Sequence, residues 1–380
     1  MIKTSLNQHF TFSSGLCIIP NNSHCFIVII MALFDSAPRS ICILRLSAIG
    51  DVCNAIAAVQ AIQRQWPETR ITWITGRLEA QLLDGLDNIR LIVFDKKQGF
   101  KAYRQLWTTL KGEQFDALLH MQYAFRASLA TLGIKATYKL GFDATRSQDC
   151  QTWFTNQHVP SPDKPHVLDG LLAFAQYIGI KDITPKWTLT YSHHDQQWAT
   201  QQLCQDKRNL VIVPGASKAY KNWTAAGYAE VMQHIHAQGW HIILAGSPAQ
   251  VELDLADQIL GLVDFPVTNL VGTSTLKQML ALLDHSDLVI APDTGPTHMA
   301  NAMGTPVIGL YAHHNPQRTG PYCYQDYVVS VYAEAIQAET GKAISALNWR
   351  ARVKDKSAMR RIQAPQVIHM FEKAVKDFGL

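Results

Sequence analysis

The chain has 380 residues, of which 47% are hydrophobic and 17% are charged. This length exceeds that of one hydrophobic core, so two domains are expected, and the composition excludes disordered and fibrous classes. The formal net charge of +4, with 15 further histidines, suits an anionic partner without identifying one. Seven scattered cysteines without a CxxC pair predict reduced thiols in a cytoplasmic protein.

The first 38 residues differ from the rest of the chain. They contain the apolar stretch CFIVIIMALF, which is too short to span a bilayer and lacks the basic start and cleavage site of a secretion signal. Met31, which precedes a polar lead into the first strand, is a candidate true start. Residues 1–38 are therefore predicted to be a poorly ordered or non-native extension.

From residue 41 onward, short apolar runs alternate with helical segments. The expected strands of the first half are ICILRL, ITWIT, RLIVF and ALLHM, with a helix over residues 54–65. Those of the second half are NLVIV, HIILA, TNLVG and residues 288–291, with helices over residues 224–236, 249–260 and 276–283. The alternation predicts an α/β fold with two mainly parallel sheets, and the prolines between residues 155 and 187 mark the crossing between them.

Ligands of open parallel sheets bind beyond the carboxyl ends of the strands, so two such domains would hold a substrate in the cleft between them. Neither half contains the GxGxxG fingerprint, which disfavours NAD or FAD. The chain also lacks GxSxG and GxxxxGK[ST], which disfavours a serine hydrolase and an ATPase.

The segment SDLVIAPDTGPTHMANAMGTPVIGLY reads as strand, glycine turn, helix and strand. Free N–H groups at the helix start favour phosphate oxygens, and side chains at the turn add donors. These candidates are Asp293, Thr294, Gly295, Thr297 and His298. The alternative is a turn that only caps the helix.

Three other strand ends carry candidate residues. After the first strand, Asp51 in LSAIGD either caps a helix or takes a proton from a substrate hydroxyl, and the sequence does not decide between these roles. Lysines in VIVPGASKAYKNW, Lys218 and Lys221, are candidates to neutralise a diphosphate, with exposed loop lysines as the alternative. Glu252 either accepts ribose hydroxyls or complements a helix dipole.

No metal motif is apparent, because Asp-x-Asp and HExxH are missing. The adjacent histidine pairs at 193–194 and 313–314 are more typical of loop residues than of two ligands to one metal ion. Near the C-terminus, WRARVKDKSAMRR concentrates positive charge. A solvated helix face is the favoured interpretation, and contact with an anionic lipid surface is second.

Taken together, ILRLSAIGDV, PGASKAYKNWTAAGYAE, APDTGPTHMANAMGTPVIGLY and NPQRTGPY resemble glycosyltransferase family 9, the bacterial lipopolysaccharide heptosyltransferases, over nearly all of residues 40–380. The similarity is to the branch that adds the first heptose to the Kdo of the inner core. The resemblance implies a GT-B fold of two Rossmann-like domains facing across a cleft. It implies an acceptor-binding domain over residues 39–185, a nucleotide-sugar domain over 186–350, and a C-terminal helix within 351–380 that crosses back to the first domain.

The resemblance also implies inverting transfer from ADP-L-glycero-D-manno-heptose to Kdo-lipid A, with no cofactor, metal or nucleic acid. The enzyme would be cytoplasmic, attached peripherally to the inner membrane of a Gram-negative cell. Carried over by position, the general base is Asp51 and the phosphate-facing cation is Lys221. The remaining implied positions are Ser217, Lys218, Glu252, Asp293, Thr294, Gly295, Thr297 and His298 for the donor, and Ser47, Gly50, Arg126 and Arg146 for the acceptor.

Two other functions remain open at this level. A UDP-sugar 2-epimerase of the same architecture would turn over its substrate without an acceptor. A non-catalytic, membrane-associated binding module is supported only by the basic run and the overall charge.

Overall fold

The computed structural model describes residues 16–19, 26–29 and 32–380. Most of the predicted extension, residues 1–15, 20–25 and 30–31, lies outside the described residues, while β1 (Leu16–Ile19) and β2 (Phe26–Ile29) pair as an antiparallel ribbon. Further on, the backbone N–H groups of Leu33 and Phe34 donate to carbonyls at the end of α5 (Val167–Ile178). The chain therefore joins the first domain earlier than predicted.

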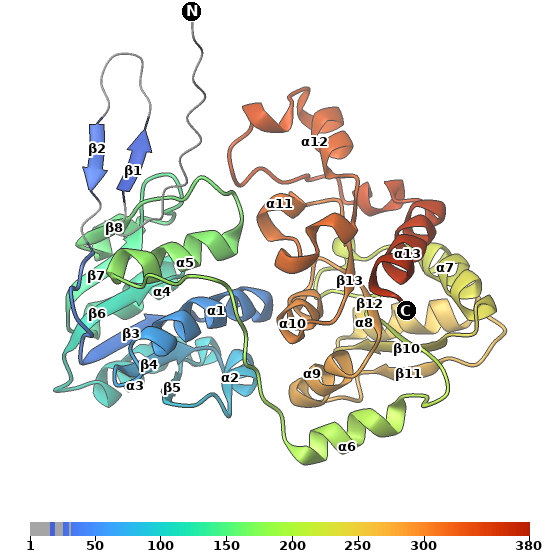
Figure 1. Ribbon diagram of the computed structural model, residues 1–380, viewed down its shortest axis with the longest axis horizontal. Helices are drawn as coiled ribbons and strands as arrows, with labels where there is room; N and C mark the ends of the chain where they lie inside the picture. The colour runs from blue at the N-terminus through green and yellow to red at the C-terminus, as the bar shows by residue number, and fades with distance from the viewer. Residues whose placement is uncertain (1–15, 20–25, 30–31) are drawn as a thin grey trace, which may run out of the picture.

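The first domain is a six-stranded parallel sheet with the strand order β5-β4-β3-β6-β7-β8 (Figure 1). Its strands are β3 (Ser40–Leu44), β4 (Arg70–Thr75), β5 (Ile89–Val93), β6 (Phe115–His120), β7 (Ala136–Phe142) and β8 (Gln157–Val159). Apolar side chains point to both faces because helices cover both. One face packs against α1 (Ile49–Gln65), α2 (Arg77–Leu83) and α5, and the other against α3 (Phe100–Thr109) and α4 (Phe125–Ala130).

The second domain repeats this plan with the order β11-β10-β9-β12-β13-β14. Its strands are β9 (Asn209–Ile212), β10 (His241–Gly246), β11 (Thr268–Val271), β12 (Leu288–Pro292), β13 (Val307–Tyr311) and β14 (Val328–Ser330). Its helices are α6 (His193–Gln202), α7 (Ala225–Ala237), α8 (Gln250–Leu260), α9 (Leu276–Asp284), α10 (Gly295–Met303), α11 (Pro316–Thr319) and α12 (Tyr332–Thr340). Both sheets have the Rossmann strand order, so the predicted pair of Rossmann-like domains is confirmed.

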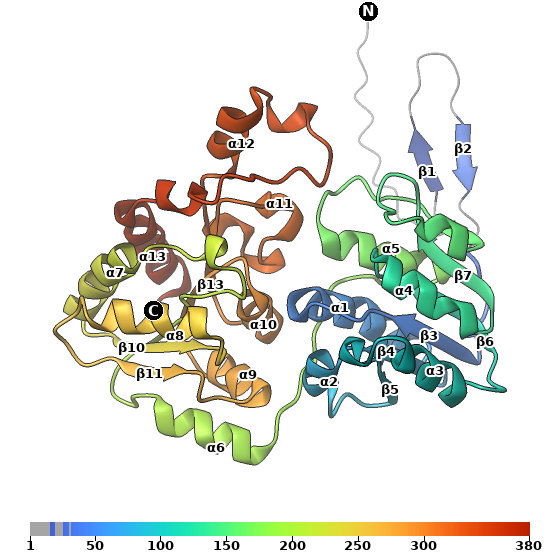
Figure 2. The ribbon, with the colours of Figure 1, turned by 180° about the vertical axis from the view of Figure 1, so that it is seen from behind.

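The C-terminal helix, α13 (Ala364–Phe378), lies beside α7 of the second domain in both views (Figures 1 and 2). Its buried face includes Val367 and Phe371, and the Phe371 ring meets that of Trp240 edge-on, 5.3 Å between centroids. An ion pair of 2.7 Å joins Glu372 to His234 of α7. The predicted crossing of this helix to the first domain is therefore wrong, because the second domain covers its apolar face.

The basic run before α13 is not the predicted helix face either. Apart from a short 3-10 turn at Ala358–Arg361, residues 350–362 form a loop. Within it Arg361 pairs with Asp355 at 3.7 Å, and the backbone of Arg352 bridges to that of His314. The loop therefore follows the second domain rather than presenting one continuous basic stripe.

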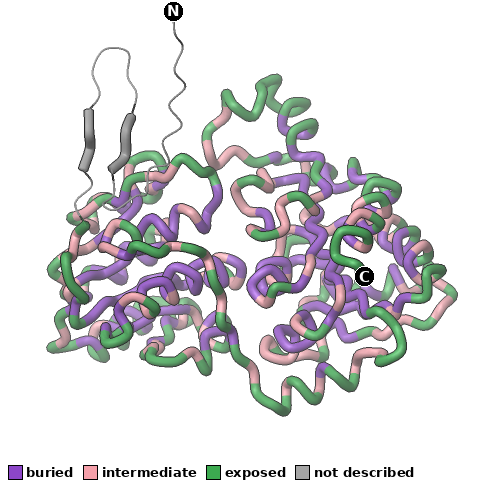
Figure 3. The backbone as a smooth tube through the Cα atoms, viewed as in Figure 1, coloured by how far each residue is buried: buried purple, intermediate pink, exposed green. Residues whose placement is uncertain are grey.

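The two domains touch where α1 meets α10, and one apolar cluster continues from α1 to α9 and α10 (Figure 3). At another point of contact, Lys277 of α9 donates to the carbonyls of Asp84 at the end of α2 and Thr190 of the linker, at 2.7 and 2.5 Å. Since α1 follows β3 and α10 follows β12, the carboxyl edges of both sheets face each other. None of the described helices combines the length and the apolar character needed to cross a membrane.

Candidate active site

Asp51 lies in the first turn of α1, at the carboxyl end of β3. Its Oδ2 accepts from the Arg45 guanidinium at 2.6 Å and from the Ala48 N–H at 3.3 Å, so the capping role is real. Among the described residues, Oδ1 has no hydrogen-bond partner, and the side chain is 39% exposed. The carboxylate is thus held by one oxygen and leaves the other free to accept a proton, which makes the structural and catalytic roles compatible.

Arg45, the partner of Asp51, was missed by the sequence reasoning. Its side chain is only 2% exposed, and besides Asp51 it donates to the carbonyl of Met121 after β6. A charged residue within the apolar run ICILRL was the available signal, because buried charges require a partner. Because Arg45 is buried and held by the Met121 carbonyl, it fixes the orientation of the Asp51 carboxylate.

Asp293 follows β12 and accepts hydrogen bonds from two side chains. Its Oδ2 accepts from Lys221 Nζ at 2.8 Å and from His314 Nδ1 at 2.5 Å. Burial alone would raise the pKa of Asp293, but the hydrogen bond from His314 and the charge of Lys221 outweigh it and hold the pKa well below its usual range. His314 was assigned to a loop; it reaches Asp293 because β13 lies next to β12.

The start of α10 has the backbone geometry of an anion site. Thr294 is the N-cap residue, and its hydroxyl makes no cap hydrogen bond. The Thr297 hydroxyl instead donates to the Pro292 carbonyl at 2.6 Å, so its role here is structural. The leading N–H groups of a helix lack intrahelical acceptors and attract anions.

His298, on the first turn of α10, touches the first domain. A Cβ added to Gly50 would lie 2.3 Å from His298 Cδ2, so only glycine at position 50 allows this approach. Burial lowers the pKa of His298 more than the charges of Asp293 and Asp51 raise it. Its Nδ1 is buried without a hydrogen-bond partner in the described part of the chain. The imidazole of His298 is therefore packed against the first turn of α1, where burial favours its neutral form.

The other predicted donor residues lie at neighbouring strand ends. Ser217 and Lys218 are exposed in the loop after β9. Glu252 is buried in the first turn of α8, where it accepts from the Ser247 N–H at 2.8 Å and the Ser247 hydroxyl at 2.6 Å. Both carboxylate oxygens of Glu252 thus already have a partner, and its contact with a ribose stays a prediction.

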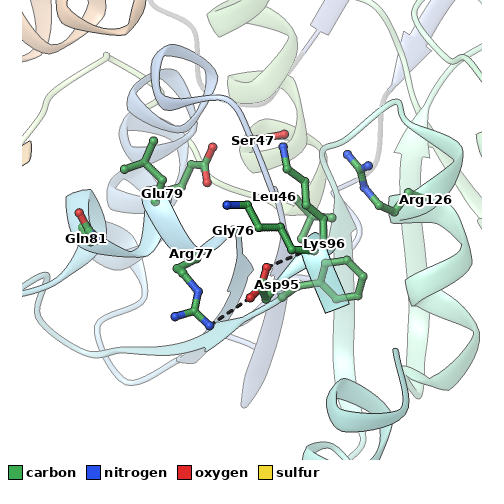
Figure 4. Close-up of a pocket in the computed structure, with 12 residues that line it drawn as sticks. Leu46, Ser47, Gly76, Arg77, Glu79, Gln81, Asp95, Lys96 and Arg126 are labelled. Carbon is green, nitrogen blue, oxygen red and sulfur yellow. Dashed lines mark hydrogen bonds and ion pairs between the residues drawn. The ribbon is translucent and has the colours of Figure 1, made fainter. Parts of the chain in front are cut away.

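A cavity of about 580 Å³ opens at the carboxyl ends of β3, β4 and β5 (Figure 4). Ser47 and Arg126, both predicted for the acceptor, line it together with Lys96 and Lys97. The buried carboxyl of Glu79 also lines it, and burial raises the pKa of that carboxyl. A basic cavity adjoining Asp51 suits an anionic acceptor.

Arg146 lies apart from that cavity, after β7. Its guanidinium is buried and donates to the carbonyls of Lys164 and His166, at 2.7 and 3.2 Å. These bonds fix the loop between β8 and α5. The predicted contact of Arg146 with an acceptor is not tested by this geometry and stays a prediction.

His166 forms a hydrogen bond between the two domains, and its burial predicts that the stability of the fold depends on pH. Its Nδ1 accepts from the Leu168 N–H and its Nε2 donates to the Gly320 carbonyl at 2.9 Å, while burial lowers its pKa to about 4. The unfolded chain binds this proton near pH 6.5 and the folded one does not, so His166 destabilises the fold progressively as pH falls from about 6.5 to 4.

We therefore expect the melting temperature of a His166→Gln variant to change less between pH 7 and 5 than that of the wild type. Thermal unfolding followed by circular dichroism at both pH values measures this. His158→Gln is the control, since His158 lies on β8 of the same domain. An unchanged pH dependence in His166→Gln would contradict the assignment.

Among the described residues, no three or more His, Cys, Asp or Glu side chains are grouped closely enough to hold a metal ion. Two Rossmann-like domains whose strand ends face each other, with Asp51 on one side and the start of α10 on the other, have the architecture of GT-B glycosyltransferases.

Comparison with known proteins identifies the family. The model of glycosyltransferase family 9 (heptosyltransferase) matches residues 103–349. The lipopolysaccharide core heptosyltransferase OpsX of Haemophilus influenzae is 50% identical over 343 residues, covering 90% of this chain and 99% of that protein. This chain therefore belongs to glycosyltransferase family 9 and is a transferase.

Two solved structures share the fold. A family 9 glycosyl transferase from Veillonella parvula superposes with a TM-score of 0.75 at 19% identity, covering 91% of this chain and 99% of that one. The heptosyltransferase WaaC of E. coli, solved with ADP, superposes with a TM-score of 0.67 at 18% identity, covering 88% and 99%.

Proposed function

We propose that this enzyme transfers heptose from ADP-L-glycero-D-manno-heptose to the Kdo of lipid A in the synthesis of the lipopolysaccharide inner core. The observation that carries the proposal is the position of Asp51 across the cleft from the anion-binding turn at Asp293–His298. The 50% identical relative, named a lipopolysaccharide core heptosyltransferase, supports heptose as the sugar.

The proposed reaction is a single inverting displacement. Oδ1 of Asp51 takes the proton of a Kdo hydroxyl, whose oxygen forms a bond to the anomeric carbon of the heptose. The bond from that carbon to the phosphate oxygen breaks on the opposite face, and ADP leaves with the electron pair. A base positioned in this way contributes about 10²- to 10⁴-fold to the rate.

The leaving diphosphate needs positive charge, and the second domain supplies it from its own residues. The N–H groups at the start of α10 and the ammonium of Lys221, held at 2.8 Å from Asp293, would face the phosphates. This supports the proposal that the transfer needs no metal.

The acceptor is attached to lipid, so we propose that the enzyme works at the cytoplasmic face of the inner membrane and binds it peripherally. The first-domain cavity supports this proposal, because basic Lys96, Lys97 and Arg126 line it and Phe125, next to Arg126 in the chain, is exposed. A different sugar or acceptor of the same pathway is the second candidate, since the residues that would contact the sugar ring are not specific to heptose.

The proposed function is tested by incubating the protein with ADP-heptose and Kdo-bearing lipid A in excess EDTA and following the acceptor by mass spectrometry. We expect a gain of one heptose, and a parallel reaction without acceptor should leave the donor unchanged. Turnover of a nucleotide sugar without acceptor would instead support the epimerase. A requirement for a divalent ion would contradict the metal-independent mechanism alone.

A further inference from the structure

Three arginines gather around one tryptophan on the side of the cleft away from the first-domain cavity. The guanidinium carbons of Arg146 and Arg318 each lie 4.7 Å from the ring centroid of Trp349, and that of Arg350 lies 5.6 Å from it. Arg350 also stacks on Tyr123, at 4.9 Å. These five residues, called the arginine cluster below, combine side chains from both domains.

The cluster carries three positive charges, and no acid of the described chain forms an ion pair with any of them. The nearest carboxylates are engaged elsewhere: Asp143 accepts from Ser161, Asp149 from the Phe125 N–H, and Asp169 from Tyr322. Asp143 and Asp169 act on the charge of Arg146, and Asp149 on that of Arg350, but none of them lies at ion-pair distance from an arginine of the cluster. Three like charges held this close together repel one another, so the cluster attracts an anion from outside.

Within the arginine cluster, Arg318 is the residue whose guanidinium can still donate hydrogen bonds to a ligand. Arg146 donates to two backbone carbonyls, and Arg350 donates to the carbonyls of Arg146 and Ser147. By contrast, the Arg318 side chain has no hydrogen-bond acceptor among the described residues, and its Nε is buried. A buried donor without a partner is costly, and a bound oxyanion would satisfy it.

The cluster adjoins the proposed base. Tyr123 and Arg146 follow β6 and β7, which lie on the other side of β3 from β4 and β5. Burial raises the pKa of the Tyr123 hydroxyl, and the charges of Arg45 and Asp51 as well as those of Arg146 and Arg318 act on it. The backbone makes the same link: Met121 accepts from Arg45, and the side chain of Gln122, next to Tyr123, accepts from the Leu46 N–H at 2.9 Å.

We infer that Arg318, backed by Trp349, Arg146 and Arg350, binds an anionic group of the acceptor, a carboxylate or a phosphate on the sugar that is attacked. The inference rests on the proposed function. The donor diphosphate has its own site at Lys221 and the start of α10, whereas this cluster is built partly by the acceptor-binding domain. Recognition at two points, the cavity and the cluster, would fix which hydroxyl meets Asp51.

The test is the Arg318→Gln variant in steady-state kinetics with both substrates. We expect the KM for the acceptor to rise roughly 10- to 100-fold, the loss of one or two charge-assisted hydrogen bonds, while the donor KM and kcat change less than about threefold. Arg318→Lys keeps the charge but loses the planar fork, so we expect an intermediate KM. Arg360→Gln is the matched control, an exposed arginine of the same domain.

Acceptors with and without a phosphate on the Kdo identify the bound group. A KM effect confined to the phosphorylated acceptor assigns the phosphate, and an equal effect on both assigns the carboxylate. An unchanged acceptor KM in both Arg318 variants, with wild-type melting temperatures, would overturn the inference. So would weaker ADP binding by Arg318→Gln in calorimetry, since it would move Arg318 to the donor. If the wild type transfers no heptose, the proposed function fails before the inference is reached.

Discussion

The substitution Asp51→Asn should lower kcat by about 10²- to 10⁴-fold and leave ADP affinity unchanged. Asparagine keeps the size of the side chain and an oxygen that can still accept from the Ala48 N–H, but it cannot take the proton of an acceptor hydroxyl. Heptose transfer at saturating substrates measures kcat, and calorimetry with ADP measures the affinity.

The control for this substitution is Glu113→Gln. Glu113 is another first-domain carboxylate that pairs with an arginine, Arg90, at 2.8 Å, and it precedes β6 at the opposite edge of the sheet from Asp51. Its replacement should change kcat by less than about tenfold. Loss of ADP binding together with activity in Asp51→Asn would argue that Asp51 only supports the contact between the domains.

The second large effect is expected from Asp293→Asn, which removes the charge that holds both Lys221 and His314. We expect ADP affinity to fall at least tenfold, because the ammonium of Lys221 loses its charged partner beside the start of α10 and keeps only the 3.2 Å bond to the backbone carbonyl of residue 293. The free energy of unfolding at pH 7 should fall by roughly 1.5–3 kcal/mol, the usual contribution of a charge-assisted hydrogen bond. Calorimetry with ADP and urea unfolding measure the two quantities.

The stability of the same variant should also depend on pH differently from that of the wild type. The folded pKa of Asp293 is depressed, so its contribution to stability is complete above the unfolded value of about 3.9 and is lost as pH falls below it. The stability of Asp293→Asn should therefore vary less with pH between about 5 and 3 than that of the wild type. Asp287→Asn, which breaks the 3.0 Å pair with Arg208 at the opposite edge of the sheet, is the control. Equal ADP affinity in Asp293→Asn and wild type would contradict the anchoring role.

The positions of Asp51 and Asp293 were predictable because each comes after a mainly apolar strand, and parallel sheets bring such strand ends to one edge. The surface against which α13 packs was not predictable. An amphipathic pattern shows that Val367 and Phe371 are buried, but not which surface covers them. That choice depends on the shape of α7 and on Trp240, which are far away in the sequence.

Residues that act through another residue were the hardest to find. His314 belongs to an adjacent histidine pair with no helical spacing, and its bond to Asp293 exists only because β13 pairs with β12. In sequence, Trp349 is separated from Arg146 by the whole second sheet, and Arg318 by all of that sheet except β14. No local pattern encodes such a meeting, because it depends on how the two domains dock.

The contact of α1 with α10 brings the positive ends of two helix dipoles close together. A Cβ on Gly295 would lie 3.0 Å from Ile49 Cγ2 and 4.0 Å from the backbone nitrogen of Gly50, so the two positive ends nearly meet. Asp51 and Asp293 offset part of this repulsion, and a diphosphate bound beside the contact would offset more. Negative charge there thus strengthens a junction that the shared apolar cluster and the bonds of Lys277 already hold. Release of the diphosphate would then loosen the two domains without parting them.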